Sequence, residues 1–355
     1  MTSDFQQAFG EAYQRYLEGV RVVSDSFSIP TGLTPKEEVW VLNKTRLYRY
    51  TPTLPPAQRY RTPLLLVYAL INKPYIFDLR PGRSFVEHML TQGFDVYLLD
   101  WGSPGPEDQR TLFVDYATQY LPRAVRKMLH VAGARDFSML GYCIGAVEAV
   151  IYAALYPDSP LRNLALLTAP LDFSAPDANA FSIWLDQKHF NVDRLVDSVG
   201  NIPVELIEAG SKMLKPMDNY VGTYASLWDK LDDEAAVEGW QALHRWVHDG
   251  VPFAGEAFRQ WVKDFVQANK LIKGQLVVRG QPVDLTQIRI PVLNVIAEYD
   301  HIVPPVQSLS ILDKVSSADK HLERVPAGHV GIMVGRSAKN NLWPKVSRWL
   351  GERSR

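Results

Sequence analysis

Short, continuous runs of apolar residues recur along the chain, and stretches long enough for helices separate them. Such runs are typical of strands that are buried on both faces of a sheet. Helix-length stretches between the runs include residues 113–131 and 147–155. Because strands and helices alternate, the pattern predicts an α/β fold with a mainly parallel sheet and helices on both faces. The predicted buried strands lie at residues 63–69, 94–100, 137–140, 164–167 and 292–296, and a last strand is expected at 321–325.

Residues 44–50 differ from these runs because polar and apolar side chains alternate along them. Alternation with a period of two is typical of a strand that has one face in water. We therefore expect this segment to form an edge strand of the same sheet.

The alternation of strands and helices stops between residues 172 and 284. This segment holds five of the nine tryptophans and several helical patterns. A structureless connection of that length is uncommon in a compact domain, so we expect a helical cap, or lid, inserted into the core. The predicted organisation is an N-terminal helical segment at 1–31, an α/β core at 32–171 and 285–355, and a cap at 172–284.

The first segment of the chain predicts an amphipathic helix, because its large apolar residues recur at helical spacing. The pattern is equally compatible with a helix that packs on its own domain and with a helix that docks onto a partner or a surface. The residues on the apolar face are Phe5, Phe9, Tyr13, Tyr16, Val20 and Val23.

Composition narrows the function further. A net charge of -1 lacks the basic excess of a protein whose main partner is nucleic acid. No apolar run is long enough to span a bilayer, and the N-terminus has no features of a signal peptide, so we expect a soluble intracellular protein. Cys143 is the single cysteine, which excludes an internal disulfide and a multi-cysteine metal cluster.

The surroundings of Cys143 indicate a nucleophile. Gly141-Tyr142-Cys143-Ile144-Gly145 follows a predicted strand and leads into a predicted helix. This is the Gly-x-Ser-x-Gly nucleophile elbow of the α/β-hydrolase fold, with cysteine in place of serine. The elbow is a strained turn, so the residues two before and two after the nucleophile must be small. The following helix N-terminus favours a thiolate. An inert buried thiol is the alternative for Cys143.

A nucleophile of this type needs an acid and a base, which follow it along the chain in that order. Asp300 ends a predicted strand, and His329 follows the last predicted strand next to Gly328. We expect His329 to accept the thiol proton and Asp300 to orient the imidazole. His301 is the nearest rival for the base.

Acyl transfer also needs hydrogen-bond donors for a developing oxyanion. The backbone N–H of Ile144, directly after the nucleophile, is the expected first donor. A second should come from the loop after an early strand, around Ala69, Leu70 or Ile71. This catalysis requires neither a cofactor nor a metal.

The thiol also bears on the substrate. If the acyl donor is a thioester, transfer to a cysteine keeps the thioester and its acyl-transfer potential, whereas an oxoester on serine would lose it. An alcohol that attacks the enzyme thioester then forms an oxoester downhill. Thioesterases and lactone hydrolases with a cysteine nucleophile satisfy the same argument.

From about residue 32 to its C-terminus, the chain resembles the polyhydroxyalkanoate synthases. Its length and motifs are most similar to the short catalytic subunits of the class III and class IV enzymes, which work with a second, non-catalytic subunit. The motifs that carry the resemblance lie at residues 68–76, 93–102, 141–145, 200–203, 254–261 and 299–304.

The resemblance implies polymerisation of (R)-3-hydroxyacyl-CoA, with short acyl groups such as 3-hydroxybutyryl favoured, and release of CoA. It implies that Cys143 carries the chain, that His329 is the base, and that Asp300 helps to activate the incoming hydroxyl. Ala146 and Ala327 depart from the glycines that many members have, but both are small.

The resemblance also implies a second synthase subunit as partner, a homodimer, and a cytoplasmic location at the surface of polyester storage granules. Two other functions stay open. A thioesterase or lactone hydrolase of the same fold would use water as the acceptor, and an inactive scaffold bound to granules would need no catalytic residues.

Overall fold

The computed structural model of the protein describes residues 2–175 and 185–354, with side chains from residue 6 onward. The side chain of Phe5, on the predicted amphipathic face, lies outside the described residues. So does Trp184, one of the five tryptophans of the predicted cap.

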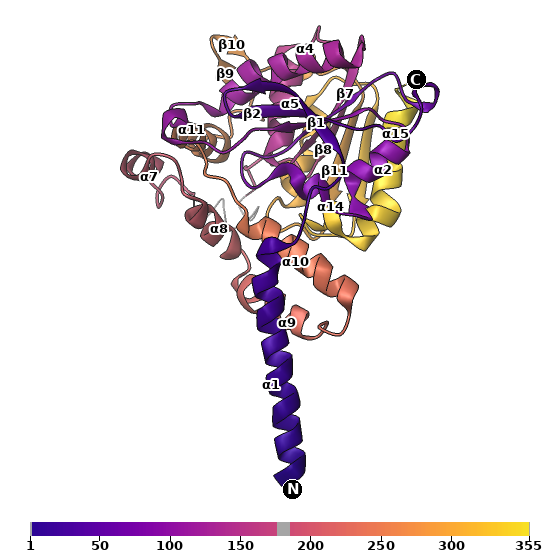
Figure 1. Cartoon of the computed structure of the whole chain (residues 1–355). Helices are drawn as coiled ribbons and strands as arrows, with labels where there is room; N and C mark the ends of the chain where they lie inside the picture. Colours follow the sequence, from indigo (N-terminus) through magenta and orange to yellow (C-terminus); the bar gives the residue numbers. More distant parts are fainter. Residues whose placement is uncertain (1, 176–184, 355) are drawn as a thin grey trace.

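An eight-stranded sheet forms the centre of the molecule (Figure 1). Its strand order is β1-β2-β6-β3-β7-β8-β11-β12, and the strands from β6 to β12 are parallel. β2 pairs antiparallel with both β1 and β6. The strands are β1 (Lys36–Leu42), β2 (Thr45–Tyr50), β3 (Leu64–Val67), β6 (Val96–Asp100), β7 (Phe137–Tyr142), β8 (Leu161–Leu167), β11 (Val292–Ala297) and β12 (Lys320–Val325).

The predicted mainly parallel sheet is confirmed, and each predicted buried strand overlaps a strand of the sheet. The prediction of an edge strand at 44–50 is wrong. This segment forms β2, and β1 covers its outer side. β1 begins with the exposed charged residues Lys36, Glu37 and Glu38, which are typical of an edge that resists pairing with other chains. Their charge concealed the strand in the sequence.

Helices cover both faces of the sheet (Figure 1). α4 and α5 lie on one side, and α2, α14 and α15 lie on the other. Every residue of α5 is buried, so its sequence is apolar all round apart from Glu148. The helices of the core are α2 (Phe85–Thr91), α3 (Phe113–Asp115), α4 (Leu121–Ala132), α5 (Ile144–Leu155), α12 (Pro305–Leu309), α13 (Ile311–Lys314), α14 (Gly331–Val334) and α15 (Trp343–Glu352).

The predicted helix at 113–131 consists of α3, a π-helical turn at Tyr116–Tyr120 and α4. α4 ends at Ala132 and is capped by Gly133, whose φ of 62° places it in the left-handed region. Glycine adopts this conformation without a steric cost, so it stops the helix.

The segment between β8 and β11 is mostly helical where it is described. It also contains a short hairpin of β9 (Val277–Val278) and β10 (Gln281–Pro282), which the sequence did not predict. Its role as a cap over the nucleophile stays a prediction, as do the boundaries at 172 and 284. Its helices are α7 (Val192–Val199), α8 (Val204–Lys212), α9 (Thr223–Trp228), α10 (Glu234–His248) and α11 (Gly255–Gln260).

The N-terminal segment forms one long helix, α1 (Thr2–Asp25), that projects from the body of the molecule (Figure 1). A smaller hairpin of β4 (Asp78–Arg80) and β5 (Arg83–Ser84) lies ahead of α2. Among the described residues, no helix is both long and apolar enough to cross a membrane.

Candidate active site

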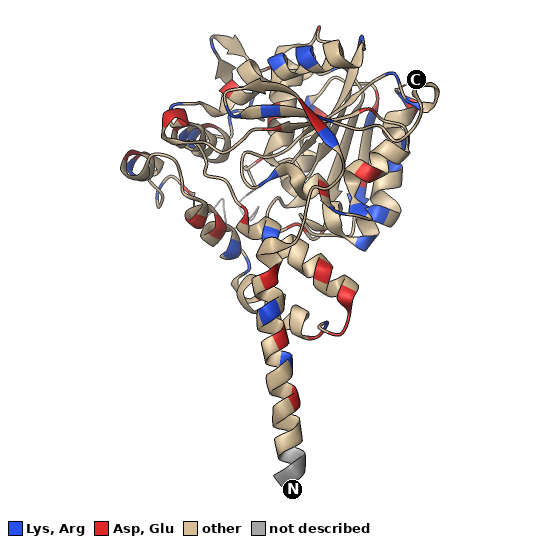
Figure 2. Cartoon of the chain, in the orientation of Figure 1, with Lys and Arg blue, Asp and Glu red and all other residues tan. Residues whose placement is uncertain are grey.

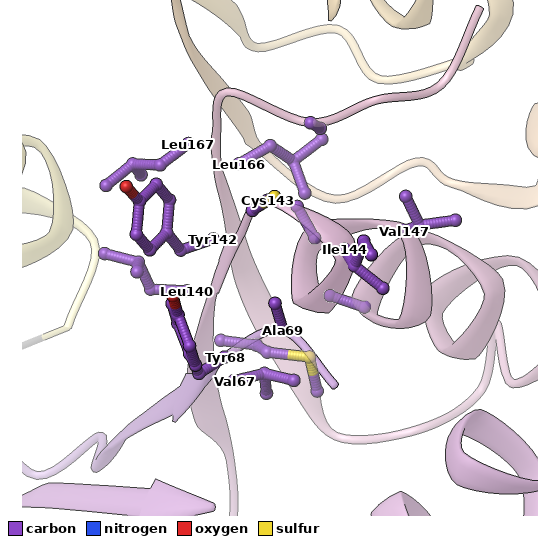
Figure 3. Packing of buried hydrophobic residues seen from close by; sticks show 14 of the residues in the cluster. Val67, Tyr68, Ala69, Leu140, Tyr142, Cys143, Ile144, Val147, Leu166 and Leu167 are labelled. Atoms are coloured by element: carbon purple, nitrogen blue, oxygen red, sulfur yellow. The ribbon is translucent and has the colours of Figure 1, made fainter. Parts of the chain in front are cut away.

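Cys143 lies at the turn between β7 and α5, next to the carboxyl end of β8 (Figure 3). Its φ of 55° and ψ of −129° are a strained conformation for a residue with a side chain. A hydrogen bond of 3.0 Å from the backbone N–H of Cys143 to the carbonyl of Leu167 fixes the turn to the neighbouring strand. The residue is only 8% exposed.

Two glycines make this turn possible. A Cβ atom added to Gly145 would collide with the backbone oxygens of Val67 and Tyr68, at the end of β3. A Cβ atom added to Gly141 would lie 2.5 Å from the Cα atom of Ala146. The close approach of α5 to these strands therefore requires both glycines of the motif, as the sequence indicated.

His329 and Asp300 come together beside the nucleophile. His329 Nδ1 lies 2.7 Å from Asp300 Oδ2, and both side chains are buried. The other carboxylate oxygen of Asp300 accepts hydrogen bonds from the backbone N–H groups of Ile302 and Val303. Because Nδ1 is engaged with Asp300, Nε2 is the nitrogen left to face a thiol.

The charges around His329 outweigh its burial. Burial alone would lower the pKa of His329, but the charges of Asp300 and Cys143 and hydrogen bonds to both side chains raise the pKa to about 10. Cys143 and Asp300 are therefore direct neighbours of the imidazole. The structure thus brings the three residues selected from the sequence into one cluster.

His301, the rival base, has a different environment. Burial and then the charge of Lys215 lower the pKa of His301. The carboxylate oxygen Oδ2 of Asp300 is hydrogen-bonded to Nδ1 of His329 and not to His301. The geometry therefore favours His329 over His301 as the partner of the thiol.

The backbone around the expected oxyanion donors is also close to the elbow. Val67 and Tyr68 contact Gly145, so Ala69 and Leu70 follow directly from a segment that touches the nucleophile turn (Figure 3). The N–H groups of Ala69 and Leu70 donate no hydrogen bond to another residue in the described part of the chain.

Sequence reasoning missed two tyrosines at the site. The ring of Tyr142 stacks on the ring of His329 at 5.2 Å, and its hydroxyl donates a 3.0 Å hydrogen bond to the carbonyl of His329. Tyr68 packs against Tyr142, and burial, followed by the charge of Cys143, raises the pKa of Tyr68 well above its usual value. Tyr142 occupies a variable position of the elbow motif, so the motif carries no signal for it.

Comparison with known protein families agrees with this fold. A model described as "alpha/beta hydrolase fold" matches residues 62–336, and a model described as "Poly-beta-hydroxybutyrate polymerase (PhaC) N-terminus" matches residues 23–89. A relative from Allochromatium vinosum, named "Poly(3-hydroxyalkanoate) polymerase subunit PhaC", is 38% identical over 342 residues, or 96% of this chain and 95% of its own length. The chain belongs to the poly(3-hydroxyalkanoate) polymerase family. This is a family of acyltransferases with the α/β-hydrolase fold.

Other relatives of the same name have different lengths. The relative from Synechocystis is 36% identical over 97% of this chain and 91% of its own length. The relative from Haloferax mediterranei is 38% identical over 92% of this chain, but the chain spans only 65% of that protein. Poly(3-hydroxyalkanoate) polymerases of different length thus contain a region similar to this chain.

Solved structures resemble the chain in fold. A monoacylglycerol lipase from Paleococcus ferrophilus matches with a TM-score of 0.52, 18% identity and 87% coverage of this chain against 99% of its own. A putative lipase from Sulfolobus solfataricus matches with a TM-score of 0.54, 14% identity and 89% coverage against 99%. At these identities the likeness shows the α/β-hydrolase fold alone.

The carboxylate of Asp300 should set the charge of His329. In Asp300→Asn the pKa of His329 should fall from about 10 to near or below its usual 6.5, because the cost of burial remains while the largest attraction is lost. Stability that this interaction contributes is fully present below pH 6.5 and is lost as the pH rises through about 10. NMR titration of the chain with 13C-labelled histidine, with His329→Gln to assign the signal, measures the shift.

Asp249→Asn provides the matched control, because the carboxylate of Asp249 accepts a hydrogen bond from Tyr75 away from the imidazole. It should leave the titration of His329 unchanged. An unchanged titration in Asp300→Asn would show that the ion pair does not hold the proton on His329.

Proposed function

We propose that the chain polymerises (R)-3-hydroxyacyl-CoA, with short acyl groups such as 3-hydroxybutyryl preferred, and releases CoA through a thioester on Cys143. The observation that supports this most directly is the buried cluster in which His329 lies between Asp300 and the only cysteine of the chain. Membership of the poly(3-hydroxyalkanoate) polymerase family supports the substrate class.

The reaction starts with acylation of the thiol. His329 accepts the proton of Cys143, and the thiolate attacks the carbonyl carbon of the acyl-CoA thioester. When the tetrahedral intermediate collapses, the bond to the sulfur of CoA breaks, and the imidazolium returns the proton to this leaving group. The products of the step are free CoA and an acyl thioester on Cys143.

Elongation repeats the same proton movements with an alcohol as nucleophile. The 3-hydroxyl of another acyl unit loses its proton to His329, with Asp300 stabilising the imidazolium that forms. The hydroxyl oxygen attacks the carbonyl of the enzyme thioester, an ester bond forms, and the thiolate of Cys143 leaves and regains the proton. Each cycle therefore lengthens the ester chain by one unit and regenerates the thiol.

The oxyanion of both intermediates needs fixed donors. The backbone N–H of Ile144, at the first turn of α5, is the first donor in this proposal, and its position at a helix N-terminus favours negative charge. The second is the N–H of Ala69 or Leu70, whose donors have no partner among the described residues.

A thioesterase or lactone hydrolase with the same three residues is the alternative, and the acceptor of the acyl group distinguishes it. A synthase releases CoA and leaves insoluble polymer, whereas a thioesterase releases one free hydroxy acid with each CoA. The similarity to polymerases along nearly the whole chain favours the synthase.

The decisive experiment follows CoA release and product together. With 3-hydroxybutyryl-CoA, the wild-type chain should release CoA and form polymer, and Cys143→Ala should lose at least about a thousandfold in rate because the nucleophile is gone.

His329→Ala should block acylation, while Asp300→Asn should still accept a labelled acyl group but elongate slowly. Free 3-hydroxybutyrate in place of polymer would replace the synthase with a thioesterase.

We also propose that the segment from residue 172 to 284 acts as a mobile cap that shields the thioester from water. The described helices α7 to α11 of this segment should exchange amide hydrogens faster than β3 and β7 of the core, because a cap must open to admit substrate. Hydrogen exchange with mass spectrometry measures this difference. Equally slow exchange in the cap helices and in β7 would contradict the mobile cap.

As a partner we propose a second, non-catalytic polymerase subunit, with the catalytic chain itself a homodimer at the surface of storage granules in the cytoplasm. The relatives are named as polymerase subunits, which supports a partner. Specific CoA release and polymer yield should rise when the chain is co-expressed with its second subunit, because binding shifts the population towards the active state. Equal activity with and without that subunit would show that the chain is self-sufficient.

A further inference from the structure

Tyr68 lies at the end of β3, directly before the residues proposed as backbone oxyanion donors. β3 is the neighbour of β7 in the sheet, with Val67 opposite Gly141 of the elbow. The carbonyl of Tyr68 reaches the nucleophile turn, because a Cβ atom added to Gly145 would lie 2.5 Å from its oxygen. Tyr68 therefore begins the loop from which the α/β-hydrolase fold takes its second oxyanion donor.

Aromatic neighbours fix the ring of Tyr68 from several sides. Its centroid lies 5.5 Å from that of Tyr142, which itself stacks on His329 (Figure 3). Trp246 of α10 contacts the same ring at 6.5 Å from the segment proposed as the cap. The indole N–H of Trp101 donates a 2.8 Å hydrogen bond to the carbonyl of Tyr68. A ring held in this way keeps its hydroxyl in one place, as preorganised catalysis requires.

The hydroxyl of Tyr68 is the polar group of this cluster that the fold does not use. Among the described residues it forms no hydrogen bond. The polar hydrogens of its ring neighbours are engaged, because Tyr142 donates to the carbonyl of His329 and Trp246 donates to the carbonyl of Lys73. A buried phenol normally has a partner. An unengaged hydroxyl beside a nucleophile indicates a partner that arrives with the substrate.

Tyr50 shows what distinguishes Tyr68 from an ordinary buried tyrosine. The hydroxyl of Tyr50 also lacks a partner in the described part of the chain, but it is sealed from solvent within the core. The hydroxyl of Tyr68 is not sealed in this way, although the residue is only 4% exposed, so a substrate atom can approach it. Tyr50 lies on β2, which β6 separates from β3. The two residues are therefore similar in burial and different in access to the site.

The charge of the nucleophile acts on the phenol of Tyr68. Burial, followed by the charge of Cys143, raises the pKa of Tyr68 well above its usual value. The phenol therefore stays neutral at neutral pH and acts as a hydrogen-bond donor, not as a base. When the thiolate attacks, negative charge passes from the sulfur to the oxygen of the carbon that the sulfur has joined. An O–H group close enough to interact with the charge on the sulfur is also placed to stabilise that oxygen.

We propose that Tyr68 is a catalytic residue and that its hydroxyl donates a hydrogen bond to the oxyanion of both tetrahedral intermediates. The inference rests on the proposed acyl transfer through Cys143, and it adds a side-chain donor to the backbone donors of that proposal. The sulfur bonds to the carbonyl carbon while the C=O π electrons move to the oxygen. The proton of Tyr68 stays on the phenol throughout, and the hydrogen bond weakens again when the C=O bond re-forms and the leaving group departs.

Tyr68→Phe tests the proposal, because it removes one hydroxyl and keeps the ring. With 3-hydroxybutyryl-CoA, kcat for CoA release should fall about a hundredfold while KM stays within about twofold, because the hydrogen bond strengthens only with the oxyanion. Rapid quenching of the first turnover should show acylation slowed by the same factor as elongation, because both steps pass through an oxyanion. Tyr50→Phe is the matched loss of a buried hydroxyl and should leave both rates unchanged.

A tetrahedral adduct provides a readout that needs no turnover. In a trifluoromethyl ketone joined to CoA by a thioether, the ketone carbon accepts the thiolate of Cys143, and the ketone oxygen becomes an oxyanion with no leaving group. Calorimetry should show that Tyr68→Phe binds this ketone about a hundredfold more weakly than the wild type does. The affinity for CoA alone, which forms no oxyanion, should not change. An equal loss for both ligands would show a contact to bound CoA and overturn the proposal.

Stability and the state of the imidazole separate a chemical role from a structural one. Tyr68→Phe should unfold at the same temperature as the wild type, because the lost hydroxyl has no partner in the described chain. The NMR titration of His329 should also be unchanged, because the phenol acts on the oxyanion and not through the imidazole. An altered titration of His329 would make Tyr68 a positioning residue and overturn the oxyanion role.

An unchanged kcat in folded Tyr68→Phe, or a loss confined to KM, contradicts the proposal as well. CoA release by the wild-type chain judges the proposed polymerase activity separately. A wild type that releases no CoA refutes that activity, whereas an active wild type with an equally active Tyr68→Phe refutes only the oxyanion role. Binding of the ketone to the two chains judges Tyr68 in either case.

Discussion

The backbone conformation of Cys143 is the constraint on which the rest of the site depends. A φ of 55° for a cysteine is costly, and it persists because the surrounding chain leaves no other path. The carbonyl of Leu167 holds the N–H of the turn, and α5 approaches β3 so closely that Gly145 has no room for a Cβ atom. The strain is thus sustained by the packing of a wholly buried helix against central strands, which Gly141 and Gly145 allow.

The same packing places His329 beside Asp300, which stabilises the buried charge of the imidazolium. His329 would lose its proton on burial alone, and Asp300 reverses this by its charge and its hydrogen bond. Asp300 is itself fixed by two backbone N–H donors, so the carboxylate cannot turn away from the imidazole. Tyr142 lies next to Cys143 in sequence and holds His329 through its ring and hydroxyl. The elbow and the base loop are therefore connected directly.

The parts of this arrangement that a sequence can predict are those with a local signal. Strands buried on both faces have apolar runs, and the elbow has a spacing that steric contact requires, so β7, Cys143 and α5 were predictable. The order of acid and base then selected Asp300 and His329. β1 was missed because exposed charges interrupt it. Tyr142 and Tyr68 were missed because their contacts join residues that are distant along the chain, and no local pattern records them.

The same limit explains why the sequence left the role of α1 open. Its apolar spacing is compatible with packing on its own domain, and near the root this is what α9 provides. No local pattern in the sequence indicates how far along α1 its contact with the rest of the chain extends. In the structure α1 is longer than the part that α9 and α10 contact. On the N-terminal side of Arg15, the large apolar side chains of Phe9 and Tyr13 are more than half exposed, and Gly10 has no neighbour within 4 Å.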